Sequence, residues 1–173
     1  VTGVRFAGKF TSASLSDELL AMFFAGAKST ASQSSGTVSS GVLLIVSGLA
    51  SANTISSGGT EIVTTAGTAT APTVSSGGTI AFGGGSVTSL TVASGGTKLV
   101  LTGVTVSGSV AAASNGVALV VSGTVSANSV LSGGSEIVMS GGSAAGATIS
   151  GGTEIVSSGG RASGAVVLAG GTE

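Results

Sequence analysis

Two glutamates, Glu136 and Glu154, are the residues whose type and spacing come nearest to catalytic chemistry. They lie 18 residues apart in nearly identical local sequences, SEIV and TEIV. If each copy forms one turn of a coil, the two carboxylates lie about 5 Å apart, close to the separation that a retaining glycosidase uses. Ile80, Lys98 and Ala118 fill the same position in other copies. We therefore interpret it as a tolerant, solvent-facing position and expect no catalysis there.

The residue types on which most other catalytic and metal sites depend are missing. The sequence contains no cysteine, histidine, tryptophan or tyrosine, so it has no thiolate or imidazole ligand and no nucleophile paired with histidine. Asp17 is the only aspartate, and the aspartate-bearing calcium nonapeptide is absent. We expect no cofactor, no bound metal and no enzymatic activity.

Composition also limits the partners. The 173 residues include 5 basic and 6 acidic side chains, with a net charge of −1, and 42% are hydrophobic. Such a chain has no electrostatic attraction for nucleic acid or an anionic membrane. The longest apolar run, from Leu19 to Ala27, is much shorter than the roughly 18 to 20 residues of a membrane-spanning helix. We expect no nucleic-acid partner and no membrane-spanning segment.

The elements that would position the glutamates repeat from Ser40 onward, with a period of 17 to 20 residues. That period is too short for a pair of helices, and each glycine inside a helix would cost about 1 kcal/mol. Short β-branched runs separated by glycines indicate strands joined by tight turns. We predict an all-β fold, a parallel β-helix (β-solenoid) of about seven turns. Its units begin at Ser40, Ser57, Ser76, Ser94, Ser114, Ser132 and Ser150.

Equivalent residues of successive turns should form columns along the axis of the coil. We interpret two neighbouring apolar columns as its core. A third apolar column precedes the glycine pairs, and the longer unit from Ser94 breaks its register. The first column contains Ile45, Ile62, Ala81, Leu99, Leu119, Ile137 and Ile155. The second contains Val46, Val63, Phe82, Val100, Val120, Val138 and Val156.

Glycine pairs mark one corner of every predicted turn. Asn115–Gly116 replaces the pair once, and asparagine is the next-best residue at positive φ, so the corner imposes a backbone requirement. The glycines therefore have a structural role. The predicted turn glycines are Gly58, Gly59, Gly77, Gly78, Gly95, Gly96, Gly133, Gly134, Gly151 and Gly152.

Residues 1–39 differ in composition and are predicted to be a cap or docking segment preceding the repeat solenoid at 40–173. A helix is expected at about 15–27, with Asp17 and Glu18 in its first turn. Apolar residues cover most of its circumference, so it should pack against the end of the solenoid or a neighbouring subunit. The candidate self-association residues here are Phe6, Phe10, Phe23 and Phe24.

The units SGGSEIVMSGGSAAGATI and SGGTEIVSSGGRASGAVVL resemble the strand-loop-strand repeat of AIDA-type autotransporter passengers. The resemblance covers Ser40 to Glu173. It implies a right-handed parallel β-helix at the surface of a Gram-negative bacterium, or outside it, acting in adhesion, self-association and biofilm formation. The implied partners are further copies of the chain and host or bacterial cell surfaces. The resemblance also implies sugars on repeat serines, with Ser57, Ser76, Ser132 and Ser150 as candidate O-glycosylation sites.

We therefore expect an extracellular structural or adhesive solenoid whose neutral surface lets copies stack end to end or laterally. Because passengers of this kind are normally followed by an export domain, we expect a fragment of a larger protein or an end completed by another chain. One alternative is a head-to-tail filament, since GGTE followed by VTGVRFAG resembles GGTEIVTTAG. The other, which we disfavour, is a polysaccharide-acting enzyme using Glu136 and Glu154.

Overall fold

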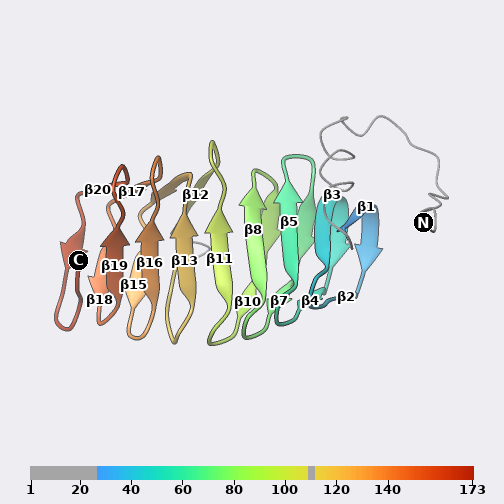
Figure 1. The fold of residues 1–173 in the computed structure, drawn as a ribbon, viewed down its shortest axis with the longest axis horizontal. Helices are drawn as coiled ribbons and strands as arrows, with labels where there is room; N and C mark the ends of the chain where they lie inside the picture. Colours follow the sequence, from blue (N-terminus) through green and yellow to red (C-terminus); the bar gives the residue numbers. More distant parts are fainter. Residues whose placement is uncertain (1–26, 109–111) are drawn as a thin grey trace.

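Parallel strands wound into a coil make up the part of the chain that the structure describes (Figure 1). The computed structural model describes residues 27–108 and 112–173, and of residues 27–34 it describes only the backbone. Each strand pairs with its equivalents in neighbouring turns, at the spacing of about 4.8 Å that is usual between strands. The result is a β-solenoid of about seven turns, as the repeat predicted.

The first face of the coil is a continuous sheet along its whole length, in the strand order β19-β16-β13-β11-β8-β5-β3, with β1 also pairing with β3. β-branched residues are frequent in these strands, as expected for a pleated, half-buried surface. The strands are β1 (Ala27–Ser34), β3 (Leu43–Ser51), β5 (Thr60–Thr64), β8 (Thr79–Gly83), β11 (Thr97–Val100), β13 (Ala118–Val121), β16 (Ser135–Val138) and β19 (Thr153–Val156).

Two further faces close each turn, and each of them is divided into two sheets. On the second face, the last part of β3 continues into β6 (Thr68–Thr70) and β9 (Ser86–Thr88). A separate sheet then contains β12 (Thr105–Ser107), β14 (Thr124–Ser126), β17 (Ser143–Ala145) and β20 (Arg161–Ser163). The third face contains β2 (Thr37–Val38), β4 (Thr54–Ile55), β7 (Thr73–Val74) and β10 (Thr91–Val92), and then β15 (Ser129–Leu131), β18 (Thr148–Ser150) and β21 (Val166–Val167).

The predicted register between turns is confirmed, with one correction. Strand pairing connects Ile62, Leu99 and Ile155 in one column. In β13, however, Leu119 pairs with Lys98, and Val120 takes the place predicted for it. The unit from Ser114 is therefore displaced by one residue from the predicted alignment.

The corner of that unit explains the displacement. Gly116 pairs with Gly95 before it and Gly133 after it, so it is the equivalent of the first glycine of each pair. Asn115 occupies the place of the preceding serine and Val117 that of the second glycine. The prediction that Asn115 replaces the first glycine is therefore wrong, although Asn115 does have a positive φ of 51°.

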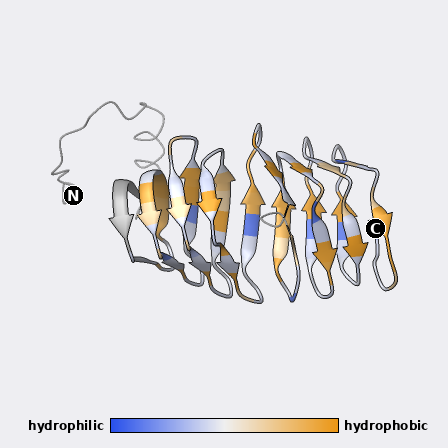
Figure 2. Cartoon of the chain, turned by 180° about the vertical axis from the view of Figure 1, so that it is seen from behind, coloured by the Kyte–Doolittle hydropathy of each residue, from blue (hydrophilic) through white to orange (hydrophobic). Residues whose placement is uncertain are grey.

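The predicted orientation of the strands on the first face is also wrong. The column that contains Glu61, Glu136 and Glu154 points into the coil, and these three side chains are 0%, 0% and 2% exposed. The column of Ile62, predicted as core, points outward. Because side chains of a strand alternate between its two sides, the inward residues of TEIV are the glutamate and the valine. Figure 2 shows hydrophilic bands within the otherwise hydrophobic strands of this face.

The valine column and the third-face column form the apolar core. In β13 Val121 replaces the predicted Val120. Val156, also predicted as core, is 39% exposed, and Val92 on the third face is half-buried. The core members on the first face include Val46, Val63, Phe82, Val100, Val121 and Val138, all 0 to 3% exposed. Those on the third face include Val38, Ile55, Val74, Val130 and Ile149, all 0 to 2% exposed.

The two glycines of a corner pair are required for different reasons. Gly58 has a φ of +72°, a left-handed conformation that side chains disfavour. Gly59 has no such φ, but a Cβ atom there would lie 2.1 Å from the carbonyl oxygen of Val38 in the preceding turn. The pair therefore lets successive corners stack in direct contact.

Several predictions for residues 1–39 fall outside the described residues. These include the four phenylalanines and the helix at 15–27, apart from Ala27, which begins β1. Parallel pairing with β3 already starts there, so the coil includes residues N-terminal to Ser40. Among the described residues, no helix has the length and apolarity needed to cross a bilayer.

Candidate interaction surface

The outer side of the first face carries a column of aliphatic side chains beside a column that consists mainly of threonine and serine. We call the column of aliphatic side chains, together with the threonine and serine residues beside it, the aliphatic stripe. Four of its central members are half-buried and Ile155 is 49% exposed, whereas Ile45 and Ala81 are covered by their neighbours. Thr60, Thr79 and Thr97 run beside it. The aliphatic members, in register order, are Ile45, Ile62, Ala81, Leu99, Val120, Ile137 and Ile155.

Most charge is withdrawn from the surface. The described side chains include six charged ones, of which four are buried in the coil and only Arg161 and Glu173 are exposed. The remaining surface consists largely of hydroxyl, glycine and aliphatic groups. It therefore generates little electrostatic repulsion between copies. The four buried residues are Glu61, Lys98, Glu136 and Glu154.

Two of the buried carboxyl groups have a dedicated hydrogen-bond partner. The Nδ2 atom of Asn53 donates to Oε2 of Glu61 over 3.0 Å, and Nδ2 of Asn128 donates to Oε2 of Glu136 over 2.8 Å. Both asparagines are 1% exposed and lie eight residues before their glutamate, at the corner between the second and third faces. Each asparagine thus links one turn to the next through the interior.

Glu154 lacks this partner. Ala147 occupies the corner position equivalent to Asn128, because Ser129 and Thr148 are paired in β15 and β18. Within the described part of the chain, neither carboxyl oxygen of Glu154 has a hydrogen-bond partner. A buried polar group without a partner destabilises the fold by about 1 to 3 kcal/mol.

Burial changes the ionisation of these groups. It raises the pKa of Glu61 and Glu136, and the asparagine hydrogen bonds offset part of that increase. Burial, together with the charges of Glu136 and Glu173, raises the pKa of Glu154 to about 7. Burial also lowers the pKa of Lys98 to about 8, and its ammonium group donates to the carbonyl oxygen of Ala112 over 2.6 Å.

The geometry places Glu136 and Glu154 in direct register on adjacent turns, as predicted, but on the inside. A polysaccharide outside the coil does not contact them. The described residues also contain no group of three or more acidic, histidine or cysteine side chains that could hold a metal ion. The inward glutamates therefore belong to the interior of the coil and not to its outer surface.

The candidate glycosylation serines lie at the corner of the glycine pairs. Ser57, Ser76 and Ser132 are exposed, and Ser150 is half-buried. The Oγ atom of Ser57 would lie 2.7 Å from a Cβ atom on Gly77, and Oγ of Ser76 would lie 2.6 Å from one on Gly95. The glycine of each following turn therefore leaves room for the hydroxyl group.

The corner asparagines were not predicted as functional residues, although the sequence contains a signal for them. Asn53 and Asn128 occur in SANTISSGGTEIV and SANSVLSGGSEIV, each eight residues before a glutamate. The third complete copy of the motif, before Glu154, reads AAGATISGGTEIV and has no asparagine. The shared presence of asparagine and glutamate indicates a contact between them.

Comparison with known proteins supports the fold. No family model and no curated protein matches the chain. Among solved structures, the chain is similar to the crystal structure of the TibC-catalyzed hyper-glycosylated TibA55-350 fragment, with 32% identity and a TM-score of 0.59. The alignment covers 82% of this chain and 62% of that fragment, which comes from an autotransporter adhesin. The chain is therefore similar in sequence and fold to an autotransporter passenger, as the repeat units indicated.

Proposed function

We propose that this chain is an extracellular or cell-surface adhesive β-solenoid that associates with further copies of itself through the aliphatic stripe. The stripe is the observation that carries the proposal. The similarity to the TibA fragment supports an adhesive role at a cell surface. Enzymatic activity is not part of the proposal, and the burial of Glu136 and Glu154 supports leaving it out.

The stripe favours lateral contact because its spacing is regular. Successive members are one strand apart, so two coils aligned side by side can bring the partly exposed aliphatic groups into contact. These are Ile62, Leu99, Val120, Ile137 and Ile155. Burial of apolar surface contributes about 25 cal/mol per Å², so each contact is weak. Many turns acting together give avidity. A long rod of such turns would bind much more tightly than a short one.

Lysine substitutions in the stripe test this proposal. We expect the triple variant Ile62→Lys, Leu99→Lys and Ile137→Lys to lose self-association by at least tenfold, because it places positive charges on the contact surface. The matched control carries Thr54→Lys, Thr91→Lys and Thr148→Lys, which add the same charge to the third face. Sedimentation velocity at several concentrations measures the effect, and circular dichroism verifies folding. Equal loss in both variants would refute the aliphatic stripe as the contact surface.

Salt provides an independent test of the same contact. An apolar contact without ion pairs should persist, or strengthen, as ionic strength rises from 0.05 to about 1 M, where the Debye length falls to about 3 Å. Light scattering across this range measures association. Disappearance of association at high salt would indicate ion pairs involving Arg161 or another charged group instead.

We further propose that the exposed corner serines carry sugars. The support is the exposure of Ser57, Ser76 and Ser132 together with similarity to a fragment described as hyper-glycosylated. Intact-mass analysis of the chain co-expressed with TibC should show added increments of the mass of a sugar residue. Replacing these three serines by alanine should remove a matching number of increments. Unchanged modification in that variant would exclude this corner.

A further inference from the structure

Successive turns separate between the third and fourth turns of the coil. On the first face, β8 and β11 remain paired throughout. On the second face, β9 pairs only with β6, and β12 pairs only with β14. No strand pairing joins β9 to β12, so the sheet ends at one and a new sheet begins at the other. We call this interruption the seam.

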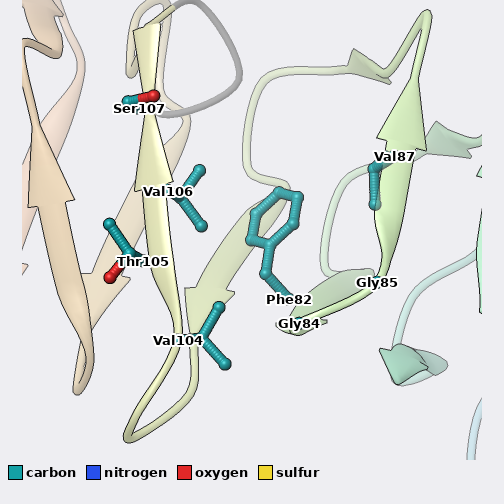
Figure 3. Close-up of a pocket in the computed structure, with 8 residues that line it drawn as sticks. All are labelled: Phe82, Gly84, Gly85, Val87, Val104, Thr105, Val106 and Ser107. Atoms are coloured by element: carbon teal, nitrogen blue, oxygen red, sulfur yellow. The ribbon is translucent and has the colours of Figure 1, made fainter. Parts of the chain in front are cut away.

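One feature of the sequence accounts for the seam. Phe82 is the only aromatic residue beyond position 24, and it takes a place in the core column between Val63 and Val100. Its ring lies between β9 and β12 (Figure 3). This larger side chain thus holds the two strands apart.

The seam exposes backbone groups of two strands that face each other. The backbone carbonyl of Val104 accepts a hydrogen bond from the backbone N–H of Thr124 in the following turn. Backbone groups of successive residues point to opposite edges of a strand. Thr105 and Ser107 therefore direct their N–H and C=O groups toward the seam. Since Ser86 donates to the preceding turn, Val87 directs its backbone groups toward the seam from β9. Among the described residues, these edges have no paired strand, and edges of this kind accept an added strand.

The space between these edges is a partly open cavity of about 210 Å³, lined by the side chains of Phe82 and three valines together with backbone and hydroxyl groups (Figure 3). Its lining contains no charged residue. Val87 and Val106 are half-buried, whereas Val125, the equivalent of Val106 in the next turn, is 0% exposed. Core positions are thus partly open to solvent here. The lining residues are Phe82, Gly84, Gly85, Val87, Val104, Thr105, Val106 and Ser107.

We propose that the seam binds one extended, uncharged peptide segment of a separate partner protein, which lies parallel to β9 and β12 and pairs with both. A strand is favoured over a small apolar molecule because only a strand satisfies the backbone donors and acceptors on both edges. This site lies on the second face and does not depend on the proposed function of the aliphatic stripe.

The flanking strands define the sequence that fits. In both β9 (Ser86–Thr88) and β12 (Thr105–Ser107), a valine lies between two residues with hydroxyl groups, and the valine side chain points inward. A partner with the same alternation places a β-branched side chain over Phe82 and its polar neighbours in solvent. A lysine in the middle position would place a charge over the Phe82 ring without a counter-charge among the described lining residues.

Titration of the ¹⁵N-labelled chain with acetyl-Ser-Thr-Val-Ser-Thr-amide tests the proposal. We expect amide shift changes concentrated in residues 85–88 and 104–107, and slower amide exchange at Thr105 and Ser107. The same peptide with lysine in place of valine, or with an N-methylated valine, should bind at least tenfold more weakly. Shift changes spread over other parts of the coil, or equal binding by all three peptides, would overturn the proposal.

Two variants separate the site from a general effect on folding. Phe82→Val restores the valine column, should let the edges approach, and is expected to reduce binding at least tenfold. Thr105→Pro removes one donor at an edge without changing the apolar lining, and should weaken binding similarly. Unchanged affinity in both folded variants would overturn the proposal. So would concentration-dependent shifts at the same amides without peptide, which would assign the seam to a second copy of the chain.

Discussion

Glu136 and Glu154 are neighbours in one column and both are buried, yet their surroundings differ. The corner residue before each glutamate is different, and the charge of Glu173 acts on Glu154. Glu136 accepts a hydrogen bond from Asn128, whereas Ala147 leaves Glu154 without a partner. The burial of a carboxyl group in this coil is therefore stabilised from the preceding turn, by a residue eight positions earlier. Glu61 and Asn53 repeat the arrangement of Glu136 at the other end of the coil.

This comparison shows how a core position can accept very different residues. Leu44, Ile80, Lys98 and Leu119 occupy the same column as the glutamates. Glu61, Glu136 and Lys98 each have a hydrogen-bond partner, which is a corner asparagine or a backbone carbonyl group. Among the described residues, Glu154 has none. The polar members thus interrupt an otherwise apolar column without changing the register.

Asn128→Ala gives Glu136 the environment of Glu154, without an asparagine partner, and should have the largest effect on stability. We expect it to lower the free energy of unfolding by about 3 kcal/mol, because it leaves a buried carboxyl group unpaired. Urea unfolding measures the change. In a Glu136→Leu background the same substitution should cost much less. An equal loss in both backgrounds would show that lost packing, and not the hydrogen bond, is responsible.

The pH dependence of stability should be next in size. Burial raises the folded pKa of Glu154 from its ordinary value of 4.5 to about 7, and it raises the pKa values of Glu61 and Glu136 too. The folded state therefore binds protons more strongly, so stability is greatest below about pH 4.5 and falls as the pH rises toward 7. We expect Glu154 to contribute about 2 kcal/mol to this loss, allowing for solvent screening near Glu173.

Urea midpoints at pH 4.5, 6 and 7.5 measure this dependence. Glu154→Gln should remove the larger part of it, because glutamine remains neutral throughout. Glu173→Gln is the control, since that side chain is exposed and should alter the slope only slightly. Stability that rises between pH 4.5 and 7 would contradict the burial of these groups.

Ala147→Asn gives Glu154 the environment of Glu136, with an asparagine at the corner, and should have the smallest effect on stability. By analogy with Asn128, the new amide donates to Glu154, which stabilises the fold by about 1 kcal/mol and lowers the pKa of the carboxyl group. The gain should be larger at pH 7.5 than at pH 4.5. It should also shrink in a Glu154→Gln background. Destabilisation in every background would indicate that the corner has no room for the amide.

The repeat predicted the period, the register and the glycine corners, since these depend on which residues recur. The unit from Ser114 can be aligned with the others in two ways, with either Ser114 or Asn115 at the position of the serine before the glycine pair. The prediction placed Ser114 there, which is one residue too early. Hydrogen bonds between Gly95, Gly116 and Gly133 resolve that choice. The corner that holds the asparagines was missed because Ala52, Ala71, Ser89 and Ala127 adopt positive φ there without glycine.

The sequence by itself thus determined that this chain winds into stacked turns, and which residues lie above one another. Only the tertiary structure decided which side of each strand faces inward, where the turns separate, and what each buried glutamate contacts. Alternation along TEIV specifies that Glu and Val share a side, but apolar character alone made isoleucine look like the core residue. The corner conformations set the absolute orientation, because they determine how the strands of one turn close around its interior.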